Sequence, residues 1–497
     1  MSSAQPPEGT RSAPQGQRQV PLRAPPRPGQ AGPLLSALRS AVGDANVMHG
    51  GDLSAWERDW RKRWNGKALA VVRPGSTVEV AAVVKLCLLH GVSIVPQGGN
   101  TGLVGGGVPD DSGTQILLSL QRMHRVRHVD RANLTMTADA GCVLQALQAA
   151  ADDNGLLFPL SLAAEGSCTI GGNLATNAGG TQVLRYGNAR ELCLGLEVVT
   201  AQGEIWDGLT GLRKDNTGYD LRDLMIGSEG TLGIITGATL KLFPRPAASL
   251  TALAITQDLG QCVALLGLAQ ARLGAGLTGF EVMNAFSLSL VKQHFPQLQQ
   301  PLPAAPWTVL IECADAEGQA QARMRFEALL EAALEANLID DAVVAESLAQ
   351  SASLWHLRES IPLAQSEEGL NVKHDIALPV SAIPSFCTQT DEALGLAFPG
   401  ARLVNFGHLG DGNLHYNVQC PPGAQAADFL ARHEHDINRI VFDAVQAASG
   451  SISAEHGIGV LKRDELASRK SPVALQMMRA IKLALDPQGV LNPNRVV

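Results

Sequence analysis

Three glycine-rich tracts between residues 96 and 235 place the strongest constraint on how this chain can fold. They span residues 96–106, 166–180 and 227–235. Because glycine has no Cβ, its backbone N–H groups can approach a phosphate that a side chain would obstruct. One tract is typical of loops and bulges, but three tracts, two of them interleaved with Asn and Thr donors, favour a phosphate-bearing cofactor. The chain has no G-x-x-x-x-G-K-[ST] loop and no strand–G-x-G-x-x-G–helix unit, so a bound dinucleotide is expected on a non-Rossmann fold.

Short strands alternate with helices along the chain. The capping box Ser76-Thr77-Val78-Glu79 predicts a helix that ends at Gly91. Strands are predicted at 93–95, 134–139, 192–200 and 308–312, with an Ala/Leu/Glu-rich helix at 320–336. The pattern breaks at Pro244 and Pro246. We therefore predict an α+β protein with domains over 34–245 and 246–450 and a C-terminal segment over 451–497.

Composition narrows the class of protein. Residues 1–33 are rich in Pro, Gln, Ser and Arg, which predicts a disordered tail. The net charge of −8 argues against nucleic-acid binding. No apolar run of about 18 residues occurs, so no membrane-spanning helix is predicted. The 8 cysteines form no C-x-x-C pair, which argues against a zinc ribbon or an iron–sulfur cluster and favours a reduced, cytoplasmic compartment, with peripheral membrane attachment as the alternative.

Two histidines flank an Asp411-Gly412 pair, which predicts a type I′ hairpin turn. With these two residues as the loop, His408 pairs with His415. Directly opposed residues share a sheet face with Cβ atoms about 5 Å apart. The two imidazoles are therefore expected to converge on one metal ion, with Phe406 and Asn417 beside them on that face. A lone His is better explained by packing, whereas this pair favours a metal site.

Further polar residues join these histidines as candidates. Glu455 could supply a carboxylate to the metal and His456 a base, although a turn with a solvated Glu-His pair explains them equally well. Two His and one carboxylate suit Zn²⁺, and also Fe²⁺ or Mn²⁺. Arg358 and Lys373 could bind a carboxylate, although each alone is better explained as a solvated charge. The run 372–376 predicts a short strand with Lys373 and Asp375 on one face and His374 on the other.

The three glycine tracts resemble the flavin-binding segments of the vanillyl-alcohol-oxidase/p-cresol-methylhydroxylase (PCMH) type of FAD domain. This resemblance implies a two-part FAD-binding domain, followed by a substrate (cap) domain and a C-terminal segment that returns to the flavin. Many members attach FAD through a His in the first tract, and Asn100 at the matching position implies non-covalent FAD. The implied cofactor-binding residues are Pro96, Gly98, Gly99, Asn100, Thr101, Gly102, Gly166, Ser167, Thr169, Gly172, Asn173, Thr176, Asn177, Gly179, Gly230, Ile235 and Asn492.

The C-terminal motifs resemble the FAD-dependent D-2-hydroxy-acid dehydrogenases, the group that contains D-2-hydroxyglutarate dehydrogenase, D-lactate dehydrogenase and the FAD subunit of glycolate oxidase. The resemblance implies that His408, His415 and Glu455 bind a divalent metal and that His456 is the catalytic base. Arg358, Lys373 and Asn417 are the implied substrate-binding residues. Hydroxyglutarate-specific members tend to carry a hydroxyl residue four positions after the Arg, where this chain has Pro362.

The implied reaction is the oxidation of a D-2-hydroxy acid to its 2-oxo acid, with metal-assisted hydride transfer to flavin N5. The electron acceptor is expected to be a quinone or an electron-transfer flavoprotein, and a homodimer is compatible with the sequence. Three alternatives stay open. They are another flavin oxidoreductase of the same fold, the FAD subunit of a glycolate-oxidase-like complex, and a non-catalytic flavin-binding module.

Overall fold

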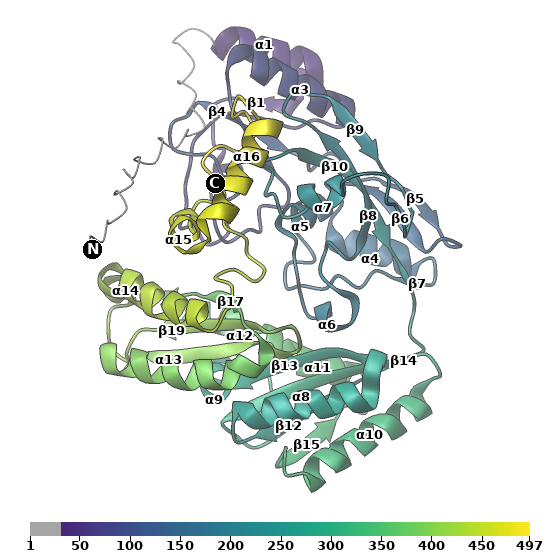
Figure 1. Cartoon of the computed structure of the whole chain (residues 1–497), viewed down its shortest axis with the longest axis vertical. Coiled ribbons are helices and arrows are strands. Elements are labelled where there is room, and N and C mark those ends of the chain that lie inside the picture. The colour runs from purple at the N-terminus through teal and green to yellow at the C-terminus, as the bar shows by residue number, and fades with distance from the viewer. Residues whose placement is uncertain (1–30) are drawn as a thin grey trace, which may run out of the picture.

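The computed structural model describes residues 31–497, which form two domains, one above the other in Figure 1. One hydrophobic core is built from residues between Leu34 and Leu242, joined by Val490 and Leu491 from the C-terminal end. The second domain has its cores between Ala248 and Val445. The chain passes from one domain to the other just after strand β11 (Phe243–Pro244).

Helix α1 (Ala31–Val42) includes residues 31–33, the last three residues of the stretch predicted as a disordered tail. Its apolar stripe, which contains Leu34, Leu38 and Val42, packs against helix α3 (Thr77–His90). This contact with α3 stabilises the helix, and the composition of residues 1–33 gives no sign of it. The rest of the predicted tail, residues 1–30, lies outside the described residues.

A mixed sheet in the order β1-β2-β4-β3 presents the first glycine tract. Its strands are β1 (Val47–Met48), β2 (Ala68–Val72), β4 (Gln115–Ser119) and β3 (Ile94–Gln97). Helix α3 forms the crossover from β2 to β3. The Ser76 side chain accepts a hydrogen bond from the Glu79 N–H, and Gly91 ends the helix in the left-handed conformation, so this predicted helix is confirmed. Because β3 ends at Gln97, its carboxyl end leads directly into the tract.

An antiparallel sheet in the order β5-β6-β10-β8-β9 brings the other two tracts beside the first. The strands are β5 (Val126–Asp130), β6 (Thr135–Asp139), β10 (Ile234–Lys241), β8 (Cys193–Val199) and β9 (Ile205–Gly208). The second tract contains helix α5 (Ile170–Thr176), which packs on β10, and the third tract leads into β10 itself. The remaining elements of this domain are α2 (Ser54–Glu57), α4 (Leu144–Asp152), β7 (Leu156–Leu157), α6 (Val183–Tyr186) and α7 (Leu221–Met225).

The second domain is a large antiparallel sheet covered on both faces by helices. The strand order is β15-β12-β14-β13-β18-β19-β16, and β17 also pairs with β19. The strands are β12 (Ala248–Thr256), β13 (Leu277–Asn284), β14 (Trp307–Asp315), β15 (Asp341–Val344), β16 (Asn371–Val372), β17 (Asp375–Ala377), β18 (Arg402–His408) and β19 (Asn413–Gln419). The predicted strand at 308–312 lies within β14.

Two sets of helices bury the two faces of this sheet. One face is covered by α8 (Leu259–Leu273), α10 (Gln319–Glu335), α13 (Ile383–Ala397) and α14 (Ala426–Ala447). The other is covered by α9 (Ala285–His294), α11 (Leu348–Glu359) and α12 (Ile361–Glu368). Phe406 belongs to the second of these cores, so side chains on its face of β18 point toward α9, α11 and α12.

The hairpin between β18 and β19 differs from the predicted type I′ turn. His408 pairs with Asn413, and Phe406, not His408, pairs with His415. Leu409–Asp411 form a 3₁₀ turn and Gly412 adopts the left-handed conformation, so the loop has two more residues than predicted. Leu409 is fully buried in the second-domain core and lies in this turn, outside the strand ladder. The predicted pairing of the two histidines is therefore wrong.

The C-terminal segment returns to the first domain (Figure 1). Helices α15 (Arg463–Arg469) and α16 (Pro472–Leu485) lead to Leu491, which forms a parallel bridge with Ile94 of β3. The buried Lys482 ammonium donates to the carbonyl oxygens of Thr231 and Leu491, at 2.7 and 2.8 Å, which fixes this return. Between residues 31 and 497, no helix is both long enough and apolar enough to cross a membrane.

Candidate active site

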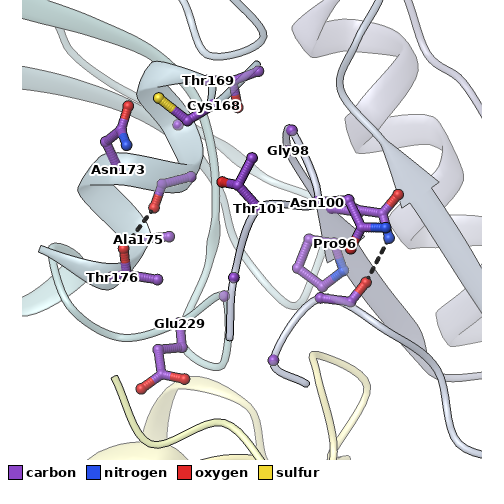
Figure 2. A pocket seen from close by; sticks show the side chains of 18 of the residues that line it. Pro96, Gly98, Asn100, Thr101, Cys168, Thr169, Asn173, Ala175, Thr176 and Glu229 are labelled. Atoms are coloured by element: carbon purple, nitrogen blue, oxygen red, sulfur yellow. Dashed lines mark hydrogen bonds between the residues drawn. The ribbon is translucent and has the colours of Figure 1, made fainter. Parts of the chain in front are cut away.

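The three glycine tracts meet around a cleft with ≈ 990 Å³ of empty space, partly open to solvent (Figure 2). The predicted cofactor-binding residues that line it are Pro96, Gly98, Gly99, Asn100, Thr101, Gly102, Thr169, Gly172, Asn173, Thr176, Gly230 and Ile235. Figure 2 shows Thr169, Asn173 and Thr176 on one wall and Pro96 and Asn100 on the opposite wall.

The first tract offers a row of backbone donors to the cleft. Among the described residues, none accepts a hydrogen bond from the backbone N–H groups of residues 98–102. Successive unpaired N–H groups form a concavity that binds anionic oxygens. This part of the cleft therefore fits the pyrophosphate of a dinucleotide.

Glycines 98 and 99 are required by the contact between the first two tracts. A Cβ on Gly98 would lie 2.4 Å from Thr169 Oγ1, and one on Gly99 would lie 2.1 Å from the carbonyl oxygen of Ser167. At Gly102, in contrast, a Cβ would meet no protein atom within 4 Å. The first two glycines thus serve packing, whereas Gly102 keeps space beside the cleft free.

Five predicted cofactor-binding residues do not line the cleft: Gly166, Ser167, Asn177, Gly179 and Asn492. Asn492 lies behind it, where its amide donates to the carbonyl oxygens of Gly106 and Glu229, at 3.0 and 2.7 Å. Gly179 lies against Glu455, since a Cβ there would be 2.7 Å from Glu455 Oε1. Asn492 thus supports a wall of the cleft, and Gly179 lies beside the residue proposed as a metal ligand.

His408, His415 and Glu455 converge, even though the hairpin register differs from the prediction. One possible ligand atom from each lies within 4.8 Å of the others. The His408 and His415 rings are 5.7 Å apart between centroids, and His408 Nε2 is 3.9 Å from Glu455 Oε1. In an antiparallel pair, diagonal residues on one face still reach each other, which explains the convergence. Two imidazoles and a carboxylate fit a divalent cation.

Glu281 is a buried carboxylate between His408 and Arg358 that we did not predict. Its Oε1 accepts a hydrogen bond from His408 Nδ1 at 2.7 Å, and its Oε2 accepts one from Arg358 Nε at 2.9 Å. Burial lowers the pKa of His408, but Glu281 outweighs it and raises the pKa to about 9. An acidic residue in the apolar strand segment Phe280-Glu281-Val282-Met283 is the signal that sequence analysis could have used.

Two carboxylates fix the segment that carries Glu455 and His456. Asp375 Oδ2 accepts hydrogen bonds from the backbone N–H groups of both residues, each at 2.9 Å. Glu229, which belongs to the first domain, accepts the N–H groups of Ile458 and Gly459, each at 2.7 Å. Residues 455–459 are therefore held between the two domains.

His456 lines the cleft and stacks near His415, with 6.3 Å between ring centroids. Its Nδ1 lies 3.6 Å from Asp375 Oδ2. Burial lowers the pKa of His456 to about 4, so its imidazole is neutral at pH 7 and able to accept a proton. This histidine therefore connects the cleft to the His408–His415–Glu455 cluster.

Two cations beside His456 form no ion pair with any described residue, although the carboxylates of Glu434 and Asp59 act on Arg61 from a longer distance. Neither Arg61 nor Lys373 forms a hydrogen bond or an ion pair with any residue of the described range 31–497, and both are half-buried. Burial, and then the Arg61 charge, lower the pKa of Lys373 to about 8. Arg61 follows α2 in a loop whose Arg63 pairs with Glu434 of α14 at 2.8 Å. The sequence analysis did not single out Arg61.

The predicted strand over 372–376 is interrupted at Lys373 and His374, between β16 and β17. Asn417 is buried there, and both of its amide atoms have protein partners: its oxygen accepts the His374 N–H and its nitrogen donates to Gln365, each at 3.0 Å. The structure does not place Asn417 on the cleft. One of its two amide N–H groups has no partner among the described residues, so its contact with substrate stays a prediction.

Comparisons with known proteins cover most of the chain. Residues 68–208 match the family described as "FAD binding domain", and residues 245–496 match "FAD linked oxidases, C-terminal domain". A D-2-hydroxyglutarate dehydrogenase of Xanthomonas citri pv. viticola is 42% identical over 93% of this chain and 97% of its own length. The bovine protein named "D-2-hydroxyglutarate dehydrogenase, mitochondrial" is 39% identical over 93% of this chain and 83% of its own.

A solved structure of p-cresol methylhydroxylase with substrate bound has the same fold. Its TM-score is 0.76 at 16% sequence identity, and the match covers 94% of this chain and 97% of that one. This likeness confirms the expected PCMH-type architecture.

Proposed function

This chain belongs to the family of FAD-linked oxidases that includes the D-2-hydroxyglutarate dehydrogenases, and from that premise we propose that it oxidises D-2-hydroxyglutarate with the help of a divalent metal ion. It is an FAD-dependent oxidoreductase that converts a D-2-hydroxy acid to the 2-oxo acid.

The residues of the cleft would hold FAD without a covalent bond. The unpaired N–H groups of residues 98–102 would bind the pyrophosphate. Asn100, at the position of the attachment His in the related FAD domains, turns its amide to the carbonyl oxygens of Ala55 and Arg58, at 3.3 and 2.9 Å. An amide is not a nucleophile toward the flavin ring, so acid denaturation should release all of the yellow colour.

Bound FAD supplies a two-electron acceptor, and a divalent cation supplies Lewis-acid polarisation of the 2-hydroxyl group. His408, His415 and Glu455 would hold the cation, with Zn²⁺ expected and Fe²⁺ or Mn²⁺ as alternatives. His456 would accept the hydroxyl proton, because it is neutral at pH 7 and lies on the cleft. Arg358 would orient the acid through the guanidinium N–H groups that Glu281 leaves unused.

The observation that carries the choice of a dicarboxylic acid is the pair of unpartnered cations Arg61 and Lys373. A half-buried cation without a counter-ion is costly, and two of them raise each other's cost. A second carboxylate on the substrate would give both cations an ionic partner and offset one of the two charges. D-Lactate has only one carboxylate and would leave both cations unpaired, so it is the second candidate. Pro362 favours D-lactate, because it stands where hydroxyglutarate-specific relatives tend to carry a hydroxyl residue.

The test is an anaerobic bleaching experiment on the flavin-loaded protein. D-2-Hydroxyglutarate should reduce the flavin at a lower concentration than D-lactate, D-malate or glycolate, and L-2-hydroxyglutarate should not reduce it. Faster bleaching by D-lactate would reject the dicarboxylate and keep the enzyme class. Absence of bleaching by every acid would favour the non-catalytic flavin module. Normal turnover after removal of all metal would reject the role of the cation.

The electron acceptor that we propose is a quinone or an electron-transfer flavoprotein, and the location that we propose is the cytoplasm. Turnover of the isolated chain with an artificial dye would argue against the alternative that it works only as the FAD subunit of a glycolate-oxidase-like complex. Sedimentation of the flavin-loaded protein would show whether it forms the compatible homodimer.

A further inference from the structure

Glu281 lies at the centre of the second-domain sheet, where a carboxylate needs specific partners. On β13 the side chains alternate, so that Phe280 and Val282 enter one core while Glu281 and Met283 face the other. Glu281 is 0% exposed and pairs across the ladder with His408 of β18. Burying an ion at such a position is expensive unless charge and hydrogen bonds compensate it.

The two oxygens of this carboxylate serve two different functional residues. Oε1 accepts the hydrogen bond of His408 Nδ1 at 2.7 Å, while Oε2 receives both Nε and Nη2 of Arg358 at 2.9 Å. Arg358 reaches down from the end of α11 and lies over the Phe406 ring, 4.8 Å from its centroid. Glu281 therefore accepts hydrogen bonds from both a residue of the metal cluster and the guanidinium proposed to bind substrate.

We propose that Glu281 is a positioning residue that joins metal binding to substrate binding in this active site. The inference rests on the proposed function, because it concerns the same metal ion and the same hydroxy acid. By holding the proton of His408 on Nδ1, Glu281 leaves Nε2 as the ligand atom, on the side that faces Glu455 at 3.9 Å. By holding Nε and Nη2 of Arg358, it fixes the plane in which the remaining N–H groups meet a carboxylate.

A purely structural role would predict a different pattern of effects. Glu312, on the neighbouring strand β14, is also a carboxylate among apolar residues, and it accepts hydrogen bonds from Thr278 at 2.8 Å and Trp355 at 2.9 Å. It touches neither His408 nor Arg358. If Glu281 only stabilised the sheet, neutralising either glutamate would have comparable consequences. If Glu281 positions both residues, only its own replacement changes metal and substrate affinity.

The experiment compares Glu281→Gln, Glu281→Asp and the matched control Glu312→Gln in flavin-loaded, metal-stripped protein. Glu281→Gln keeps the size of the side chain, but its NH₂ group must face a donor of His408 or Arg358. We expect the dissociation constant for Mn²⁺, titrated alone and followed by calorimetry, to rise about 10–100-fold in Glu281→Gln. The KM for D-2-hydroxyglutarate should rise in the same variant, while Glu312→Gln leaves both values within about twofold.

Glu281→Asp keeps the charge, so its Mn²⁺ affinity should lie between those of Glu281→Gln and the wild type. If Glu281→Gln does not fold, the Mn²⁺ affinity of Glu281→Asp tests the proposal instead. Flavin absorbance and melting temperature identify misfolded variants. Unchanged Mn²⁺ binding in a folded Glu281 variant, or equal weakening in Glu312→Gln, would overturn the inference while the proposed function stands. If the wild-type protein binds no divalent cation, both the role of Glu281 and the proposed metal site are overturned. The Mn²⁺ titration of the wild type separates this outcome from the others.

Discussion

The Asp375 carboxylate accepts the backbone N–H of His456 at 2.9 Å, so a buried residue of the second domain fixes the segment that carries the proposed base. The same oxygen accepts the N–H of Glu455, and the other oxygen accepts the Asn413 amide at 3.0 Å. Burial opposes ionisation, but His456 and Lys462 hold the pKa of Asp375 well below its ordinary value. The metal carboxylate and the base thus depend on one anion for their placement.

Asp375→Asn should therefore lower kcat by at least about tenfold while flavin stays bound. The new NH₂ group must face either the two backbone donors or the Asn413 amide, so at least one contact becomes repulsive. We also expect a loss of about 1–3 kcal/mol in the free energy of unfolding. Rapid-reaction flavin reduction and denaturant titration measure the two effects, and an unchanged reduction rate would contradict the positioning role.

His456→Ala should abolish turnover without loss of flavin or metal, because the residue lines the cleft but is not one of the three proposed ligands. A positioned base contributes about 10²–10⁴-fold to the rate. His408→Ala and His415→Ala should instead lose activity together with bound metal. Metal analysis by mass spectrometry separates the two classes of variant; metal loss in His456→Ala would assign it to the ligand set.

The KM for D-2-hydroxyglutarate should depend on the charge of Lys373. Its pKa is lowered to about 8, so it is a cation below pH 8 and neutral above it. If only the cation binds the second carboxylate, KM should rise about tenfold between pH 7 and pH 9. Lys373→Arg should remove this rise. D-Lactate serves as the control substrate, and an equal rise with D-lactate would mean that Lys373 does not recognise the second carboxylate.

Gly99→Ala and Gly102→Ala should have different consequences. A Cβ on Gly99 meets backbone atoms of the second tract, at 2.1 Å from the Ser167 carbonyl oxygen, so this variant should lose stability even without flavin. A Cβ on Gly102 meets no protein atom within 4 Å, so the stability of the flavin-free protein should be unchanged and only flavin affinity should fall. Melting curves with and without FAD test both expectations. Equal melting temperatures of the two flavin-free variants would refute the distinction.

Glu197 should make the stability of the first domain depend on acid pH. Burial raises its pKa, but hydrogen bonds from Arg127, Thr77 and Thr236 outweigh this and hold the pKa below its ordinary value. A lowered pKa stabilises the fold above the unfolded-state value of about 4.3 and loses that stabilisation as pH falls through the folded-state value. Glu197→Gln should cost about 1–3 kcal/mol at pH 7 and less at pH 3, as measured by urea unfolding. An equal cost at both pH values would exclude the ionised form as the cause.

The glycine tracts were the most predictive part of the sequence. A loop that offers backbone N–H donors to a phosphate needs several glycines within a short segment, and this pattern is visible in the sequence. The family match over residues 68–208 confirms the FAD-binding domain that they indicated. The capped helix over 77–90 was predictable for the same reason, since Ser76, Glu79 and Gly91 act within a few residues of each other.

The hairpin and the buried carboxylates were not predictable from local pattern. The register around His408 depends on where Leu409 is buried, which is decided by the distant core of the second domain. Glu281 and Asp375 acquire their partners from strands and loops far along the chain. Arg61 becomes notable only because the fold brings it near Lys373, and neither cation forms an ion pair within residues 31–497.

The return of Asn492 and Leu491 to strand β3 has a consequence for the order in which the holoprotein forms. The loop after β3 is synthesised long before the residues that support it from behind, since Asn492 follows Gly106 by 386 residues. A nascent chain that has completed residues 31–245 still lacks this support. Tight flavin loading should therefore be a late, post-translational event, and a chain shortened before residue 490 should emerge colourless even if both sheets have formed.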